Sequence, residues 1–109
     1  MTGVCLDNLS VPVVKGLSGL TLLPRQAAPR QTACIRCGRC IAACPMGLEP
    51  VEILENFAEK DFDALKARCV DLCVACGSCT FACPAKRPVS QTMGLAKGWY
   101  MAELRKGGK

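Results

Sequence analysis

The sequence predicts a mainly α-helical domain at residues 32–109, preceded by a β segment and linker at residues 1–31. Three observations lead to this fold class. A twelve-residue cysteine pattern occurs twice, at residues 34–45 and 73–84. Apolar residues recur at helical intervals between the two copies and after the second one. Residues 10–23 instead contain short runs of Val, Leu and Thr around glycines, which is typical of strands.

The β segment is predicted to be a hairpin. Residues 10–14 and 19–23 would form its strands, and residues 15–18 (KGLS) their connection. Pro12 would place the first strand at a sheet edge, because proline has no N–H to donate to a neighbouring strand. A lone hairpin is only marginally stable in water. We therefore expect residues 1–31 to be a β segment and linker that form the end of a larger, missing domain.

The segment between the two cysteine copies is long enough for two helices. Pro50 suits the first turn of a helix that should end near Lys60. Asp61 can N-cap a second helix, which we expect to continue to Leu72 and lead into the second copy.

A third helix is expected after Pro88, with Ser90 as its N-cap and Gly107 at its end. Its apolar residues recur at helical intervals: Met93, Ala96, Tyr100 and Leu104. The frame of residues 32–109 is thus expected to be helical.

Four further apolar positions carry predictions. Trp99 and Tyr100 are expected to be packing residues rather than electron relays. Met46 and Met93 are expected in the core.

Each cysteine copy has the form Cys-x2-Cys-x2-Cys-x3-Cys-Pro. In this spacing three thiolates can surround one cubane iron–sulfur cluster, and the third and fourth cysteines lie on one side of a helical turn. Gly38 and Gly77 precede the third cysteine of each copy, where a missing Cβ lets backbone N–H groups approach sulfur. The eight thiolates, the number that two [4Fe–4S] clusters need, come from Cys34, Cys37, Cys40, Cys44, Cys73, Cys76, Cys79 and Cys83.

The fourth cysteine of each copy is predicted to bind the other copy's cluster, as in two-cluster ferredoxins of this pattern. Such a crossover makes the two loops one folding unit. The first cluster is then assigned to Cys34, Cys37, Cys40 and Cys83, and the second to Cys73, Cys76, Cys79 and Cys44.

Other interpretations of the cysteines are weaker. Structural zinc is the non-redox alternative, but zinc sites favour paired or mixed Cys/His sets, and the chain contains no histidine. A disulfide framework would suit a secreted protein, and residues 1–9 lack the features of a signal peptide. Cys5 and Cys69 are expected to be small buried apolar residues. Phe81, beside Cys79, is expected to shield a cluster from water.

Charge and hydropathy exclude two function classes. Because each oxidised cluster with its four thiolates carries about −2, two clusters reduce the formal charge of +5 to about +1. Nucleic-acid binding is therefore not expected, and the single Trp and Tyr give no base-stacking pattern. No apolar run reaches the length of a membrane-spanning helix. Thiolates available for iron indicate a reducing compartment such as the cytoplasm.

The two copies differ in charge. Arg36 and Arg39 stand where the second copy has Ala75 and Ser78. A positive charge favours the electron-rich form, so the first cluster should be the easier one to reduce. One charge at about 7 Å changes the reduction free energy by about 0.6 kcal/mol in water and about 2.4 at an effective dielectric of 20, or roughly 25 to 100 mV.

The chain resembles the C subunit of the Rnf complex, the membrane-bound, ion-pumping ferredoxin:NAD oxidoreductase. The resemblance extends over essentially the whole chain. Four segments carry it: residues 12–19 (PVVKGLSG), 34–40 (CIRCGRC), 44–48 (CPMGL) and 73–79 (CVACGSC).

The resemblance implies an α-helical ferredoxin-like domain with two [4Fe–4S] clusters, from the C-terminal part of a longer protein whose FMN and NAD(H) sites lie in the missing part. It also implies a location on the cytoplasmic face of the bacterial inner membrane, with other subunits of the complex and electron-transfer proteins such as ferredoxin as partners. The chain itself would relay electrons and contain no catalytic site. An independent soluble two-cluster ferredoxin and a cobalamin-reductase-type relative are the redox alternatives.

Overall fold

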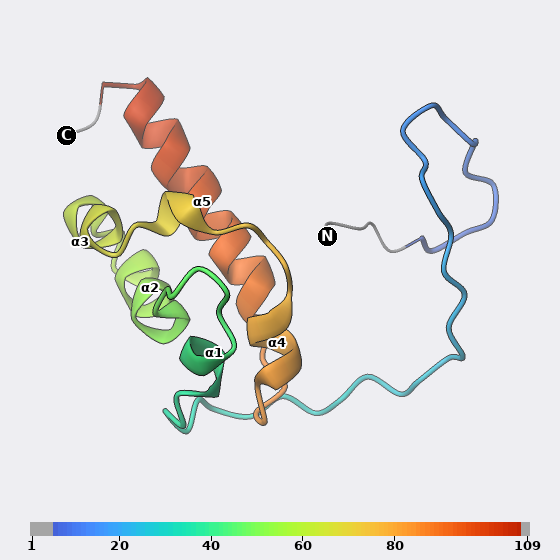
Figure 1. Ribbon diagram of the computed structural model, residues 1–109, viewed down its shortest axis with the longest axis horizontal. Coiled ribbons are helices and arrows are strands. Elements are labelled where there is room, and N and C mark those ends of the chain that lie inside the picture. The colour runs from blue at the N-terminus through green and yellow to red at the C-terminus, as the bar shows by residue number, and fades with distance from the viewer. Residues whose placement is uncertain (1–5, 108–109) are drawn as a thin grey trace.

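The computed structural model describes residues 6–107. Its helical elements are, in chain order, α1 (Arg39–Ala42), α2 (Pro50–Ala58), α3 (Phe62–Ala67), the 3-10 turn η1 (Val70–Leu72), α4 (Ser78–Ala82) and α5 (Val89–Arg105). The long helix α5 packs against α2, α3, η1 and α4, while the short helices α1 and α4 pack against each other at one end of the domain (Figure 1). The prediction of a mainly α-helical frame is confirmed.

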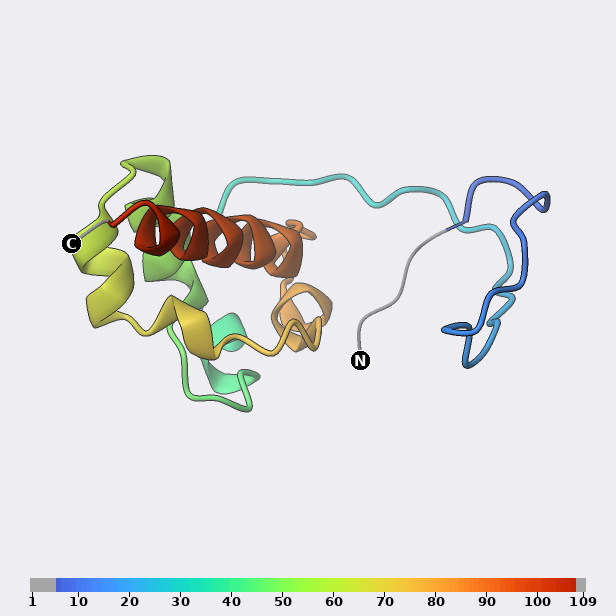
Figure 2. The same cartoon turned by 90° about the horizontal axis from the view of Figure 1, so that it is seen from above.

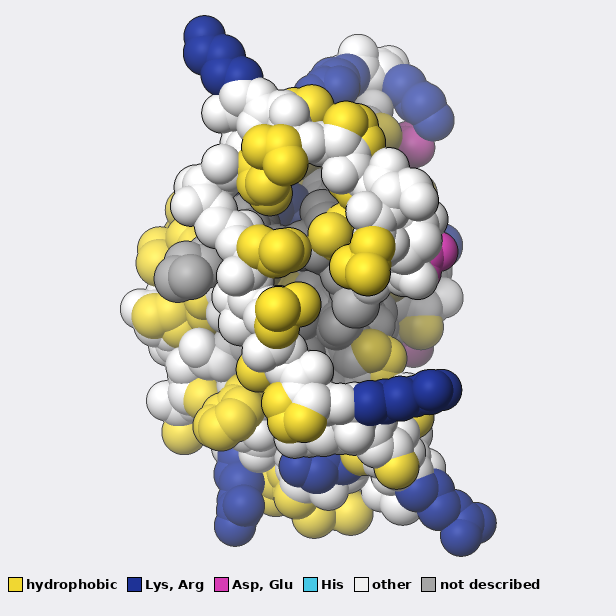
Figure 3. All heavy atoms as spheres, turned by 90° about the vertical axis from the view of Figure 1, so that its right-hand side faces the viewer, with side chains coloured by type: hydrophobic (Ala, Val, Ile, Leu, Met, Phe, Trp, Pro, Cys, Tyr) yellow, Lys and Arg dark blue, Asp and Glu magenta, His cyan; other side chains and the backbone are white. Residues whose placement is uncertain are grey.

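The predicted β-hairpin is wrong: residues 6–31 contain no strand and extend away from the helices (Figures 1 and 2). The chain does turn near the expected connection, because the backbone N–H of Leu17 donates to the carbonyl of Val14 at 3.0 Å. However, nothing covers the apolar side chains of this segment, and Leu9 is 93% exposed. Figure 3 shows apolar side chains standing in the open on the face where this segment lies. Without a buried face, strand pairing does not offset the conformational entropy that it costs.

The core lies between α2, α3, η1 and α5. Its most deeply buried side chains are those of Ile53, Leu65, Val70, Met93 and Ala96. Met93 is therefore a core residue, as predicted. The prediction for Met46 is wrong: it is 43% exposed, because it lies in the turn that follows Cys44 rather than on a helix facing the core.

Aromatic side chains close the core at the end distant from α1 and α4. Phe62 stacks on Tyr100 with ring centroids 4.9 Å apart. Trp99 meets the edges of Phe57 and Phe62, with centroid distances of 6.3 and 6.5 Å. Trp99 and Tyr100 thus have the packing role that was predicted.

Asp61 caps α3 as predicted, since its side chain accepts a hydrogen bond from the Ala64 N–H at 3.0 Å. The helix ends at Ala67, five residues before the predicted end at Leu72. The break occurs at Cys69, which has a left-handed φ of 51° and directs the chain so that Val70 enters the core. Cys69 itself is exposed, so the prediction that it is buried is wrong. Cys5, the other cysteine predicted to be buried, lies outside the described residues.

Helix α5 begins at Val89, and its cap comes from another helix rather than from Ser90. The Thr80 hydroxyl of α4 accepts a hydrogen bond from the Ser90 N–H at 2.8 Å. It also donates to the Ser90 hydroxyl at 2.8 Å. Ser90, the predicted cap residue, therefore receives the cap from Thr80, and this hydrogen bond connects α4 to α5. Gly107, with a φ of 82°, follows the C-cap of α5, as predicted.

Thr80→Val is expected to destabilise the protein by about 1 kcal/mol, because it leaves an N-terminal N–H of α5 without its acceptor. The midpoint of denaturant unfolding of the cluster-loaded protein measures this. Thr92→Val is the matched control, since the Thr92 hydroxyl only donates to the Pro88 carbonyl of its own helix, at 3.1 Å. Equal losses in the two variants would contradict a capping role for Thr80.

Candidate functional site

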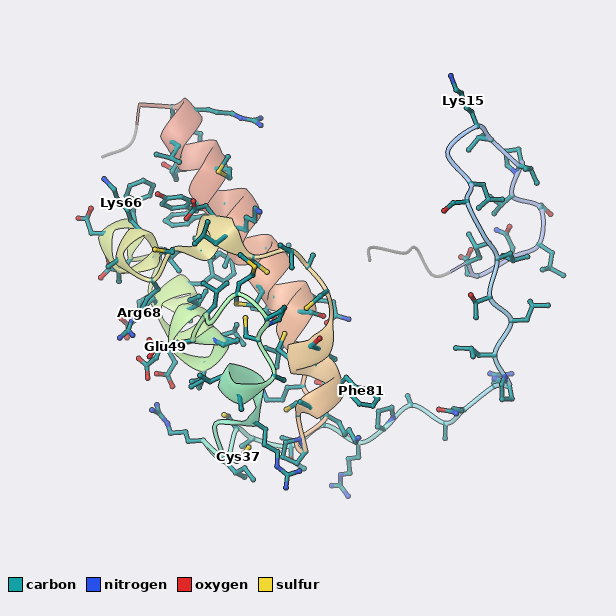
Figure 4. The ribbon with its side chains drawn as sticks, viewed as in Figure 1. Lys15, Cys37, Glu49, Lys66, Arg68 and Phe81 are labelled. Carbon is teal, nitrogen blue, oxygen red and sulfur yellow. The ribbon has the colours of Figure 1, made fainter. Side chains whose placement is uncertain are left out.

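The two cysteine copies meet where α1 packs against α4. Cys40 lies in α1 and Cys79 in α4, and the fourth cysteine of each copy follows its helix. A backbone hydrogen bond of 3.0 Å from the Thr32 N–H to the Ala85 carbonyl joins the start of the first copy to the end of the second. This bond holds the segment before Cys34 next to the segment after Cys83, and both cysteines line one cavity. The exposed end of the arrangement, with Cys37, lies at the bottom of Figure 4.

The two cysteine loops have the same backbone conformation. Gly38 and Gly77 have left-handed φ values of 73° and 81°, and each stands directly before the helix that carries the third cysteine. Two residues earlier, Arg36 and Ala75 are also left-handed, at 50° and 53°. Glycine adopts this conformation without the Cβ penalty, and both copies have glycine at the position next to the helix.

The structural repeat extends further than the sequence repeat. After the fourth cysteine, Gly47 donates to the Cys44 carbonyl and Lys86 donates to the Cys83 carbonyl, both at 3.2 Å. Their φ values are 66° and 54°. Sequence comparison missed this equivalence because one copy has glycine and the other lysine at the left-handed position. A Pro-x-x step after each fourth cysteine was the available signal.

The structure groups the cysteines into two sets of four. A cavity of about 400 Å³ is lined by Cys34, Cys37, Cys40 and Cys83. A smaller one of about 20 Å³ is lined by Cys44, Cys73, Cys76 and Cys79. Each set contains three cysteines from one copy and the fourth from the other. These are the sets that the sequence predicted, and the binding of a cluster by each remains a prediction.

Helices α2 and α5 form the walls of these cavities. Val51 and Leu54 of α2 and Val89 of α5 line the first cavity, and Pro50 and Met93 line the second. Apolar walls exclude water from one side of the sulfur atoms. Cys34, Cys37 and Cys76 are exposed, whereas the remaining cysteines of the two sets are half-buried.

Local contacts change the acidity of three thiols. Burial raises the pKa of Cys40 and Cys79. The Ser78 hydroxyl, 3.4 Å from the Cys76 sulfur, lowers the pKa of that exposed thiol. In the first loop the backbone N–H of Arg36, two residues before Gly38, donates to the Cys34 sulfur at 3.4 Å.

The charges around the two cavities differ from the sequence expectation. The Arg36 guanidinium forms an ion pair with Glu55 of α2, so its charge is partly offset. Arg39 has no carboxylate partner among residues 6–107. Beside the second set, Lys97 of α5 donates to the backbone carbonyl of Cys73 at 2.8 Å. Sequence reasoning had grouped no lysine with that loop.

The prediction that Phe81 shields a cluster is wrong, because its side chain is 91% exposed. Phe81 is two residues beyond Cys79 in α4, and two steps of a helix rotate a side chain by about 200°. The cysteine and the phenylalanine therefore lie on opposite sides of α4. Figure 4 shows Phe81 pointing away from the helices.

The donor set fits iron–sulfur clusters. All eight donors are thiols, which soft iron–sulfur chemistry requires, and they form two groups of four. Within the described part of the chain, no three Cys, Asp or Glu side chains are grouped tightly enough to hold one metal ion. Across residues 6–107, no helix is both long and apolar enough to cross a membrane.

Comparisons with known proteins agree with this chemistry. The 4Fe–4S dicluster domain family matches residues 33–87. The C subunit of the ion-translocating oxidoreductase complex of Rhodobacter capsulatus is 44% identical over 100 residues, which are 90% of this chain and 19% of that protein. The C subunit of the Na(+)-translocating ferredoxin:NAD(+) oxidoreductase complex of Acetobacterium woodii is 41% identical over 109 residues, 98% of this chain and 25% of that protein.

The chain thus spans a quarter or less of these relatives. The resemblance to the Rnf-type C subunit that the sequence predicted is confirmed over most of the chain. The match at residues 33–87 covers both cysteine copies and all the helical elements from α1 to α4. The chain therefore belongs to the family of 4Fe–4S dicluster domains.

Proposed function

We propose that the chain transfers electrons through two [4Fe–4S] clusters, as the relay domain of an Rnf-type ferredoxin:NAD oxidoreductase complex. One observation carries the proposal: the eight cysteines are divided between two cavities, four to each, with one cysteine of each set contributed by the other copy. Residues 32–109 are the proposed relay unit, because the Thr32–Ala85 hydrogen bond joins the start of this region to the end of the second copy.

Cys34, Cys37, Cys40 and Cys83 would hold the first cluster, and Cys73, Cys76, Cys79 and Cys44 the second. When bound, each cluster supplies a one-electron redox couple. The protein would hold the eight thiolates in place, and the backbone N–H of Arg36 would donate to the Cys34 sulfur. The apolar side chains of Val51, Leu54 and Val89 would exclude water from the first cavity. No nucleophile or general base is part of the proposed mechanism.

The wider setting rests on the relatives. One is named as a subunit of an ion-translocating oxidoreductase complex, and the other as a subunit of a Na(+)-translocating ferredoxin:NAD(+) oxidoreductase complex. We infer that other subunits of such a complex are the electron donors and acceptors of this chain, at the cytoplasmic face of the membrane. FMN and NAD(H) would bind elsewhere in the complex.

Anaerobic reconstitution tests the cluster proposal. The reconstituted protein should contain about eight irons and eight sulfides, and reduction should give two interacting paramagnetic signals. Zinc bound without sulfide would refute the proposal in favour of the structural zinc alternative, for which no geometric observation speaks.

Fractionation tests the partners. A tagged chromosomal copy should sediment with the membranes together with other subunits of an Rnf-type complex. After a high-salt wash, part of the tagged protein should stay with the membranes. A copy found only in the soluble fraction would instead support an independent ferredoxin.

The charge difference between the loops makes a separate prediction. Arg39→Gln is expected to lower the midpoint potential of the first cluster more than Arg36→Gln, because Glu55 already offsets the Arg36 charge. The shift for one exposed charge should be near the lower end of roughly 25 to 100 mV. A redox titration followed by electron paramagnetic resonance measures both variants. A larger shift for Arg36→Gln would show that the ion pair does not control the charge felt at the sulfur atoms.

A further inference from the structure

Helix α5 presents a row of side chains to the second cysteine set. Ser90 and Met93 line the second cavity, and Lys97 lies four residues beyond Met93, on the same face of the helix. The half-buried Lys97 side chain ends on the backbone of the first cysteine of this set, with its Nζ 2.8 Å from the Cys73 carbonyl oxygen. Within residues 6–107, Lys97 is the only cationic side chain that donates a hydrogen bond to the backbone of a cysteine of either set.

We propose that Lys97 positions the Cys73 loop and raises the reduction potential of the second cluster. The inference rests on the proposed function, since it concerns a cluster held by Cys73, Cys76, Cys79 and Cys44. It adds a residue outside both cysteine copies to the machinery that sets the properties of that cluster.

The positioning role follows from the sparse support of the loop. The Cys73 N–H donates to the Val70 carbonyl at 3.2 Å, at the end of η1, and from there to Gly77 the chain has no helix or strand. The Cys73 carbonyl has no helical partner, and the Lys97 ammonium provides its donor. A charged donor makes a stronger hydrogen bond than a neutral one, the more so when it is partly buried. Lys97 therefore connects the longest helix to the first ligand of the set.

The effect on the reduction potential of the second cluster follows from the positive charge of Lys97, which no carboxylate of residues 6–107 offsets. Lys97 forms no ion pair within the described residues, and the sequence from Cys73 to Ala102 contains no Asp or Glu. Arg36 at the first set is paired with Glu55. A positive charge that is half-buried is screened less than an exposed one and favours the more negative, reduced state. The second set therefore has its own cation, which acts in the opposite direction to the difference that Arg36 and Arg39 would create.

Three variants of the cluster-loaded protein test the proposal. Lys97→Met removes the charge and keeps a side chain of similar reach, and Lys97→Arg keeps the charge. Lys66→Met removes the same formal charge from an exposed position on α3 that lines neither cysteine cavity (Figure 4). Each is followed by redox titration with electron paramagnetic resonance, and Cys76→Ser identifies which signal belongs to the second cluster.

We expect Lys97→Met to lower the midpoint potential of the second cluster, to broaden its resonance because the loop is less fixed, and to leave the first cluster unchanged. Lys97→Arg should restore most of the potential, and Lys66→Met should change neither cluster. Equal shifts in Lys97→Met and Lys66→Met, or a Lys97→Met protein with the wild-type potential and line width, would overturn the proposal.

Loss of the second cluster from Lys97→Met would call for Lys97→Gln, whose neutral amide can still donate to the Cys73 carbonyl. A retained cluster with a lowered potential in that variant supports the proposal, and a retained cluster with the wild-type potential overturns the tuning role. A failure of the proposed function would differ from a failure of this inference. If the clusters do not form, the wild-type protein itself would lack iron and sulfide and would show no midpoint potential.

Discussion

Cys83→Ser is expected to remove the cluster of the first cysteine copy, although Cys83 belongs to the second copy. The Cys83 side chain lines the cavity of Cys34, Cys37 and Cys40, and the Thr32–Ala85 hydrogen bond keeps the two segments together. Without the fourth thiolate, one corner of a cubane has no protein ligand. The iron content should fall from about eight to about four per chain, and the signal of the second cluster should remain.

Two other substitutions make this experiment decisive. Cys44→Ser should have the reciprocal effect and remove the second cluster. Cys69→Ser is the matched control, because Cys69 is an exposed cysteine that lines neither cavity. If Cys83→Ser abolished only the signal assigned by Cys76→Ser to the second copy, each copy would bind its own cluster and the crossover would be refuted.

Removal of both clusters is expected to abolish cooperative unfolding. The buried apolar core of residues 6–107 is small and consists of nine hydrophobic residues and Pro50. Helices α1 and α4 have 4 and 5 residues, too few to be stable in water without tertiary support. In small metal-binding domains the binding free energy is largely folding free energy and reaches roughly 10 kcal/mol, comparable to the whole stability of an ordinary domain.

Circular dichroism and thermal unfolding measure this loss. After anaerobic treatment with a chelator and an oxidant, the helical signal should decrease and the melting transition should broaden or disappear. Protein carried through the same steps without chelator is the control, and reconstitution should restore the transition. Apoprotein that melts cooperatively at the temperature of the loaded protein would show that the apolar core is sufficient.

Local chemistry explains which parts of the fold the sequence could predict. Asp61 caps α3 by reaching a backbone N–H three residues away, and Gly107 ends α5 by its own backbone preference. Such signals lie within one short segment and can be read from it. The cap of α5 comes from Thr80, ten residues earlier on another helix, so only the packing of α4 on α5 shows it. The predicted hairpin failed for the related reason that strands depend on neighbours to cover them.

The same distinction applies to the candidate site. The grouping of the cysteines was predicted from the pattern of two-cluster ferredoxins, and the same groups line the two cavities. The orientation of Phe81 could not, because the short helix α4 directs Cys79 toward the cavity and Phe81 toward solvent. Lys97 was equally inaccessible, since its contact with Cys73 bridges 24 positions of sequence. Spacing thus predicts candidate ligands, whereas the residues that support them depend on which distant helices pack nearby.

If each cavity holds one cluster as proposed, the grouping of the cysteines also implies an order of events during synthesis of the chain. The second set is complete once Cys79 has been made, because its other members are Cys44, Cys73 and Cys76. The first set begins earlier, at Cys34, yet it is finished only by Cys83. A chain emerging from the ribosome would thus carry three unsatisfied thiols of the first copy throughout the synthesis of α2, α3 and α4. The first site to begin is the last to close, and those thiols would need protection from oxidation until then.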